Sequence, residues 1–204
     1  MIAVIDYGVG NLFSLTASLN YLGLDNCITS DKRVIQSAAK LILPGVGAFG
    51  DAYRKLEEAG LVEVVKDEAK SGKPLLGICL GMQMLFDKSY EHGEYKGLGL
   101  IKGEIRPIKE YVGEDLKIPH MGWNSLRFLR ESPLTRYIKE GDFVYYVHSY
   151  CAENCVSSLV AASDYGTEIA GIVENGNVFG TQFHPEKSGK TGLNIIRAFA
   201  EIGG

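Results

Sequence analysis

Cys79 lies in a stretch whose residue types suit a nucleophilic thiol. Residues 73–86 read KPLLGICLGMQMLF, and the apolar run at 75–78 predicts a buried strand that turns directly into a helix. Gly77 and Gly81 give the spacing GxCxG, which is typical of a nucleophile elbow that exposes one side chain above a sheet. The start of a helix also favours a thiolate. The alternative is a buried structural cysteine between two packing glycines.

A candidate base for this thiol occurs much later, in the segment GTQFHPE at residues 180–186. Residues 177–183 predict a strand, and in extended backbone residues two apart project to the same side, so His184 and Glu186 can face one another. Pro185 fixes its own φ and disfavours a helical His184. A carboxylate on one imidazole nitrogen would direct the other nitrogen at the thiol. Alternatively, His184 is a satisfied core histidine beside a surface glutamate.

A glycine-rich loop, PGVGAFG at residues 44–50, follows a predicted strand at 40–43. In a parallel sheet this loop lies at the same carboxyl edge as Cys79, where ligands of open α/β sheets collect. Glycines allow backbone N–H groups to point inward, and with the N–H of Leu80 they could complete an oxyanion hole. An ordinary turn is the alternative.

The elements around these segments predict an α/β fold with an open, mainly parallel sheet flanked by helices. Apolar strands at 2–6, 26–29 and 40–43 alternate with helical patterns, including a surface helix at 51–71 that Gly60 could interrupt. The second half is β-rich and partly antiparallel, with a hairpin turn at 175–177 and a closing helix at 188–202. Its expected strands span residues 97–108, 118–128, 143–150, 156–162 and 168–173.

Composition narrows the class of protein. A chain of 204 residues with 46% hydrophobic content can bury a sizeable core, and we expect one domain over residues 1–204. The net charge of -4 gives no basic surface for nucleic acid. No window resembles a membrane span or a signal peptide. The four cysteines are scattered, so we expect no disulfide framework, no metal site and a reducing, cytoplasmic location.

Taken together, three segments resemble the signature blocks of the class I (triad) glutamine amidotransferases. GICLGMQ around Cys79, PGVGAFG at 44–50 and FHPEKS at 183–188 occur in the order that the family shows, and the similarity spans essentially the whole chain. More narrowly, IDYGVGN near the start, PHMGWN at 119–124 and YYVHSY at 145–150 resemble the glutaminase subunits of imidazole glycerol phosphate synthase, from histidine biosynthesis.

This resemblance implies hydrolysis of glutamine to glutamate and ammonia. Cys79 would attack the side-chain amide, His184 would protonate the departing ammonia and then activate water, and Glu186 would orient His184. The oxyanion would be held by backbone N–H groups of Val46, Gly47 and Leu80. The amino acid portion of glutamine would be recognised by Gln83, Glu91, Ser149 and Tyr150. The alternative is that Gln83 and Glu91 are polar residues on a helix surface and that Ser149 and Tyr150 are ordinary strand positions.

The resemblance also implies a partner and no cofactor. Ammonia would pass, without escaping to solvent, to a cyclase subunit with a (β/α)₈ barrel that forms a heterodimer with this chain and makes imidazole glycerol phosphate and AICAR. The positions that resemble the subunit junction are His120, Met121, Trp123, Asn124, Tyr145 and Lys187. Composition alone leaves PHMGWN either as a docking surface or as a core strand.

Three alternatives stay open at this point. The chain could feed ammonia to another acceptor, as in anthranilate or aminodeoxychorismate synthase, and PHMGWN is the segment that argues against this. It could be a cysteine hydrolase of peptides or γ-glutamyl chains, which the HPE and PGVG segments disfavour. It could also be an inactive scaffold, although Cys79, His184 and Glu186 are all present. Glycines on both sides of Val46 further suggest a loop that is misaligned until the partner docks.

Overall fold

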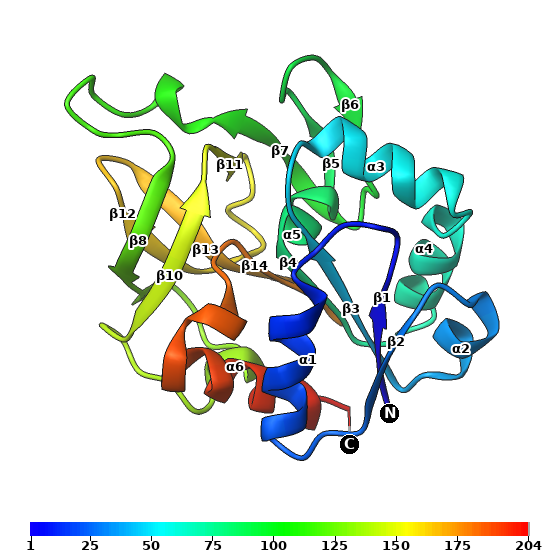
Figure 1. Cartoon of the computed structure of the whole chain (residues 1–204). Coiled ribbons are helices and arrows are strands. Elements are labelled where there is room, and N and C mark those ends of the chain that lie inside the picture. The colour runs from blue at the N-terminus through cyan, green and yellow to red at the C-terminus, as the bar shows by residue number, and fades with distance from the viewer. Residues whose placement is uncertain (204) are drawn as a thin grey trace.

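A large twisted sheet runs through the molecule (Figure 1). The computed structural model describes residues 1–203. Eight strands form this sheet in the order β2 (Asn26–Thr29), β1 (Ile2–Ile5), β3 (Lys40–Gly45), β4 (Leu75–Cys79), β14 (Val178–Thr181), β13 (Glu168–Asn175), β12 (Leu159–Asp164) and β9 (Arg127–Phe128). The five strands from β2 to β14 are parallel, and the remaining pairings are antiparallel. This architecture confirms the predicted fold class.

The inner strands are buried along their whole length and mostly apolar, because both faces of the sheet are covered. Every residue of β1, β3, β4 and β14 is buried, as expected for parallel strands between two helical layers. Successive residues of β1 serve opposite faces: Ala3 and Ile5 pack in one buried cluster, and Ile2 and Val4 pack in the other.

Helices form the two layers. Leu15 and Leu19 of α1 (Leu12–Tyr21) pack in the same cluster as the buried face of α6 (Gly189–Glu201). The opposite cluster is covered by α2 (Lys32–Ser37), α3 (Phe49–Glu58) and α4 (Val62–Lys70). The surface helix expected at 51–71 is therefore two helices, and Gly60 between them has a φ of +67°, which ends the first.

Two smaller sheets come from the second half of the chain. One pairs β8 (His120–Ser125) with β10 (Phe143–His148) in antiparallel register. The other has the order β11 (Tyr150–Glu153), β7 (Ile101–Pro107), β5 (Phe86–Ser89) and β6 (Tyr95–Lys96). The two-residue turn between β13 and β14 contains Gly176 at a φ of +60°, as the hairpin prediction requires.

The helix after Cys79 is shorter than the apolar pattern predicted. Helix α5 (Leu80–Met84) has five residues, and Phe86 already begins β5. The apolar residues at 82, 85 and 86 are all buried, because the chain passes between the large sheet and the four-stranded sheet. Because all three positions are buried, their spacing matches a helical pattern although the helix ends at Met84.

Three short 3₁₀ helices complete the description: η1 (Ile108–Glu110), η2 (Pro133–Thr135) and η3 (Pro185–Lys187). Within residues 1–203, no helix combines the length and the apolar character needed to cross a membrane.

Candidate active site

Cys79 occupies a strained corner between β4 and α5. Its φ of +54° and ψ of -111° lie in a region that non-glycine residues rarely adopt. The glycines at 77 and 81 make this corner possible: a Cβ on Gly81 would lie 1.9 Å from the carbonyl oxygen of Leu43, and one on Gly77 would lie 2.7 Å from the carbonyl oxygen of Gly81. The corner therefore packs directly on β3, which leaves the sulfur above the end of the sheet.

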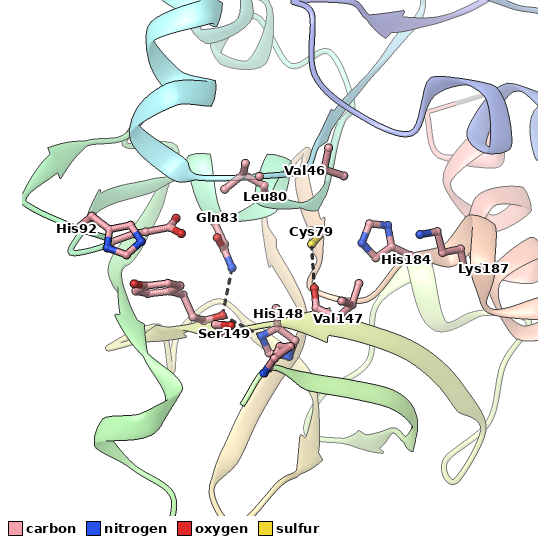
Figure 2. A pocket seen from close by; sticks show the side chains of 14 residues that line it. Val46, Cys79, Leu80, Gln83, His92, Val147, His148, Ser149, His184 and Lys187 are labelled. Carbon is pink, nitrogen blue, oxygen red and sulfur yellow. Dashed lines mark hydrogen bonds between the residues drawn. The ribbon is translucent and has the colours of Figure 1, made fainter. Parts of the chain in front are cut away.

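Strand register brings His184 to the same edge. Thr181 at the end of β14 is paired with Ile78 of β4, so the chain that follows β14 emerges beside Cys79. Figure 2 shows the imidazole of His184 facing the sulfur of Cys79. On its other side, Nδ1 of His184 lies 2.8 Å from Oε1 of Glu186, and both side chains are 3% exposed. The imidazole of His184 thus lies between the thiol of Cys79 and the carboxylate of Glu186.

The charge of His184 depends on these two neighbours. Burial alone would lower its pKa, but the bonds to Cys79 and Glu186 outweigh burial and raise the pKa from 6.5 to about 9. His184 is therefore protonated at neutral pH while it faces the sulfur, which is the state required of the acid that protonates a leaving group.

A cavity of about 520 Å³ opens over this pair. Its size is within the range of small-molecule sites. Its lining contains Cys79 and His184 together with the predicted oxyanion and glutamine-binding residues, namely Val46, Gly47, Leu80, Gln83, Glu91, Ser149 and Tyr150. Lys187 also lies at this cavity, whereas Glu186 lies behind His184, outside its lining.

Gln83 and Glu91 are buried, with 4% and 9% of their area exposed, so neither is a helix-surface group. The amide of Gln83 donates to the carbonyl oxygen of Tyr150 at 3.1 Å. Oε2 of Glu91 accepts from the backbone N–H of Phe49 at 2.7 Å, at the start of α3. Burial raises the pKa of Glu91, and the bond from Phe49 opposes that rise.

The PGVG loop is fixed at one end and open at the other. The hydroxyl of Tyr7 donates to the carbonyl oxygen of Pro44 at 2.6 Å, and a Cβ on Gly45 would lie 2.6 Å from the backbone nitrogen of Gly81. By contrast, a Cβ on Gly47 would meet nothing within 4 Å, and Val46 is 40% exposed. The peptide between Val46 and Gly47 is therefore the least restrained part of the loop.

Two residues of the site were not singled out from the sequence. The amide nitrogen of Gln182 lies 3.8 Å from the sulfur of Cys79, and Nδ1 of His148 lies 2.8 Å from the carbonyl oxygen of Tyr150. One signal was present: His148 ends an apolar strand and Gln182 directly follows one, and a buried polar group at such a position needs a partner.

The residues expected at a subunit junction separate into two groups. Met121 and Trp123 on β8 are 60% and 56% exposed, and the ring of Trp123 lies 5.9 Å from that of its cross-strand neighbour Tyr145. Lys187 is exposed too. His120, however, is 2% exposed, so it lies beneath that surface and cannot form part of an exposed docking face. Asn124 is half-buried and donates to the carbonyl oxygen of Asp164 at 2.8 Å.

Comparison with known families decides the class of protein. A family model described as "Glutamine amidotransferase class-I" matches residues 3–202. The chain belongs to this family. The amidotransferase is 54% identical over 203 residues to "Imidazole glycerol phosphate synthase subunit HisH" of Bacillus cereus, covering 99% of this chain and 95% of the relative. It is 48% identical to the protein of the same name from Caldanaerobacter subterraneus, covering 99% and 98% of the two chains.

Solved structures agree on the fold of this amidotransferase. A structure described as a glutamine amidotransferase superposes with a TM-score of 0.77 at 17% identity, covering 98% of each chain. The structure of PurLQS from Thermotoga maritima gives a TM-score of 0.74 at 21% identity, covering 97% of this chain and 96% of that one. At such identities, the likeness shows the fold alone.

Proposed function

We propose that this amidotransferase hydrolyses glutamine to glutamate and ammonia and supplies the ammonia to a cyclase subunit in histidine biosynthesis. The observation that carries the proposal is the arrangement of Cys79 and the His184–Glu186 pair over one cavity. The cyclase step, which yields imidazole glycerol phosphate and AICAR, is inferred from the name that relatives 46–54% identical to this chain carry.

The reaction begins with attack of the Cys79 thiolate on the amide carbon of glutamine, which forms a C–S bond and a tetrahedral oxyanion. The proton on His184 passes to the amide nitrogen as the C–N bond breaks, which releases ammonia and leaves a glutamyl thioester. Neutral His184 then removes a proton from water, which attacks the thioester. Glutamate leaves, and the thiolate and the imidazolium are restored. Glu186 keeps Nδ1 protonated and the ring oriented throughout.

The oxyanion of these steps is assigned to backbone N–H groups of Val46, Gly47 and Leu80. All three residues line the cavity, and Leu80 directly follows the nucleophile. The amino acid portion of glutamine is assigned to Gln83, Glu91, Ser149 and Tyr150. Within this group Glu91 is the anion, so its carboxylate is the natural partner of the α-ammonium.

The partner proposed is a cyclase with a (β/α)₈ barrel that forms a heterodimer with this chain. Its docking face is assigned to the exposed residues Met121, Trp123 and Lys187 and the half-buried Tyr145, because exposed aromatic and methionine side chains are typical of interface cores. A covered passage would keep ammonia from becoming ammonium in water. A free catalytic thiol further suits the reducing cytoplasm.

Substituting the nucleophile separates the two halves of this proposal. Cys79→Ala is expected to abolish glutamine-dependent synthesis by the complex while leaving ammonia-dependent synthesis within about twofold of wild type, because only the source of ammonia is lost. Product formation is measured with glutamine and with ammonium salt as donor. Loss of both activities would mean that the division of labour is wrong.

Glutamine hydrolysis should also depend on the partner. The restrained Gly45 and the unrestrained Val46–Gly47 peptide imply a loop that completes the oxyanion hole only after docking. We expect hydrolysis to accelerate at least about 10²-fold, the value of one oxyanion donor, when the cyclase and its nucleotide ligand are added. Equal rates with and without them would exclude gating by the loop.

A further inference from the structure

A line of hydrogen-bonded polar groups connects strand β8 with the sulfur of Cys79. Four of its side chains are almost completely buried: 2% of His120, 6% of His148, 4% of Gln83 and none of Gln182 is exposed. Burying polar groups is costly unless each has a partner. From β8 to the sulfur, each group contacts the next in this order: Asn124, His120, His148, the carbonyl of Tyr150, Gln83, Gln182 and Cys79.

One backbone carbonyl fixes the protons of both histidines. Nδ1 of His148 lies 2.8 Å from the carbonyl oxygen of Tyr150, which can only accept, so Nδ1 carries the proton. Nε2 of the neutral ring must then accept, and its partner at 3.0 Å is Nδ1 of His120, which must donate. Nε2 of His120 is left as an acceptor for the side-chain amide of Asn124 at 3.4 Å.

The same carbonyl also sets the direction of the amides on the catalytic side. It accepts from the amide nitrogen of Gln83 at 3.1 Å, and that nitrogen donates in addition to Oε1 of Gln182 at 3.1 Å. With its oxygen held in this way, Gln182 can present only its NH₂ group to the sulfur of Cys79, 3.8 Å away. An N–H donor at that position favours the thiolate, whereas the reversed amide would place a carbonyl oxygen against it.

The surroundings keep this pair of histidines neutral. The ring of His120 stacks between those of Tyr146 and Tyr165, at 4.6 and 4.0 Å between centroids. Burial lowers the pKa of His120 to about 4 and that of His148 to about 3. A proton added between the rings would make two donors face each other, so a neutral pair is the state in which the line is continuous.

We propose that His148 is a positioning residue which, through the carbonyl of Tyr150 and the amides of Gln83 and Gln182, keeps an N–H donor on the sulfur of Cys79. Figure 2 shows His148 and Gln83 converging on this carbonyl below the sulfur. His120 donates to Nε2 of His148 and so supports the tautomer that the carbonyl of Tyr150 sets. The inference rests on the proposed function, because it assigns these residues to the preparation of the nucleophile.

The test uses the rate at which iodoacetamide alkylates Cys79 at neutral pH, together with kcat for glutamine hydrolysis by the complex. The variants are made in a Cys27→Ser background, because Cys27 is only half-buried and could also be alkylated. The other two cysteines, Cys151 and Cys155, are buried, and burial raises their pKa values well above the ordinary value. We expect His148→Leu to slow alkylation and kcat together by about tenfold, the effect of one hydrogen bond to a charged group. His148→Asn, which retains a donor near the position of Nδ1, should restore most of both.

Tyr146→Phe is the matched control. Tyr146 lies on the same strand as His148, and its hydroxyl forms a buried 2.8 Å hydrogen bond with Ser163. The substitution removes this bond and retains the ring that stacks on His120. We expect it to lower the melting temperature without slowing alkylation. If His148 only stabilised the fold, His148→Leu and Tyr146→Phe would have the same effect: a lower melting temperature with no change in the alkylation rate.

The possible outcomes are separable. Wild-type alkylation and kcat in a folded His148→Leu protein would overturn the inference and leave the glutaminase function intact. If that variant does not fold, His148→Asn is compared with His148→Gln, whose amide lies near the position of Nε2 instead. Slow alkylation in the Gln variant alone supports the inference, and equal rates in the two overturn it. Failure of the wild-type complex to hydrolyse glutamine would instead reject the proposed function.

Discussion

The pKa of His184 depends on its neighbour Cys79, and this dependence can be measured. Burial lowers the pKa of His184, while its bonds to Cys79 and Glu186 raise it to about 9. Removing the sulfur leaves burial less opposed, so we expect the pKa of His184 to fall in Cys79→Ala. NMR titration of the imidazoles provides the measurement. An unchanged pKa would mean that the two groups do not interact.

The same pair makes stability depend on pH. Because the pKa of His184 is raised from 6.5 to about 9 on folding, its contribution to the free energy of unfolding is complete below pH 6.5 and is lost as the pH rises through 9. The Cys79→Ala protein should lose less stability over this interval than the wild type. His120 and His148 do not titrate in this range, since burial keeps their pKa values at about 4 and 3.

The element that decides the geometry of the site is the corner between β4 and α5. Because a Cβ on Gly81 would lie 1.9 Å from the carbonyl oxygen of Leu43, Gly81→Ala must displace backbone. We expect it to lower the free energy of unfolding by about 3 kcal/mol. Gly113→Ala is the control, because a Cβ there would meet nothing within 4 Å. Urea unfolding measures both, and equal midpoints would show that the corner tolerates a side chain.

Local pattern predicted most elements of this fold but not all. The strand at 75–78 was recognisable because both faces of the parallel sheet are covered there, which gives a continuous apolar run. The predicted helix after Cys79 was too long, because residues 82–86 are all buried and the apolar pattern therefore does not show where the helix ends and β5 begins. The short strand β6 was missed because its two residues are exposed and carry no apolar pattern.

For the site, motifs identified the residues that do chemistry, and tertiary contacts were needed for those that support it. Cys79, His184 and Glu186 stand out through their spacing from glycine and proline. The contacts of Gln182 and His148 depend on how β14 and β10 lie against β4, which no local pattern encodes. His120 was assigned to the docking surface as part of the PHMGWN segment, but alternation along β8 directs it inward.

On the scale of the whole molecule, one face combines the opening of the cavity with exposed aromatic side chains. We expect Trp123→Ala to weaken the complex with the proposed cyclase subunit about 30-fold, the value of a typical interface anchor, without changing the melting temperature of the free chain. Val156→Ala, at a residue that is 87% exposed in a different segment, should leave affinity unchanged. Calorimetric titration gives both values. Equal affinity in the two variants would move the interface elsewhere.

The position of β14 also fixes when the catalytic pair forms during synthesis. The large sheet has β4 beside β14, and within residues 1–203 the strand that carries His184 to Cys79 follows all the other strands in sequence. A nascent chain that ends before residue 178 holds the thiol without its base. The nucleophile therefore becomes competent only after residues 178–186 have been translated and β14 has paired with β4.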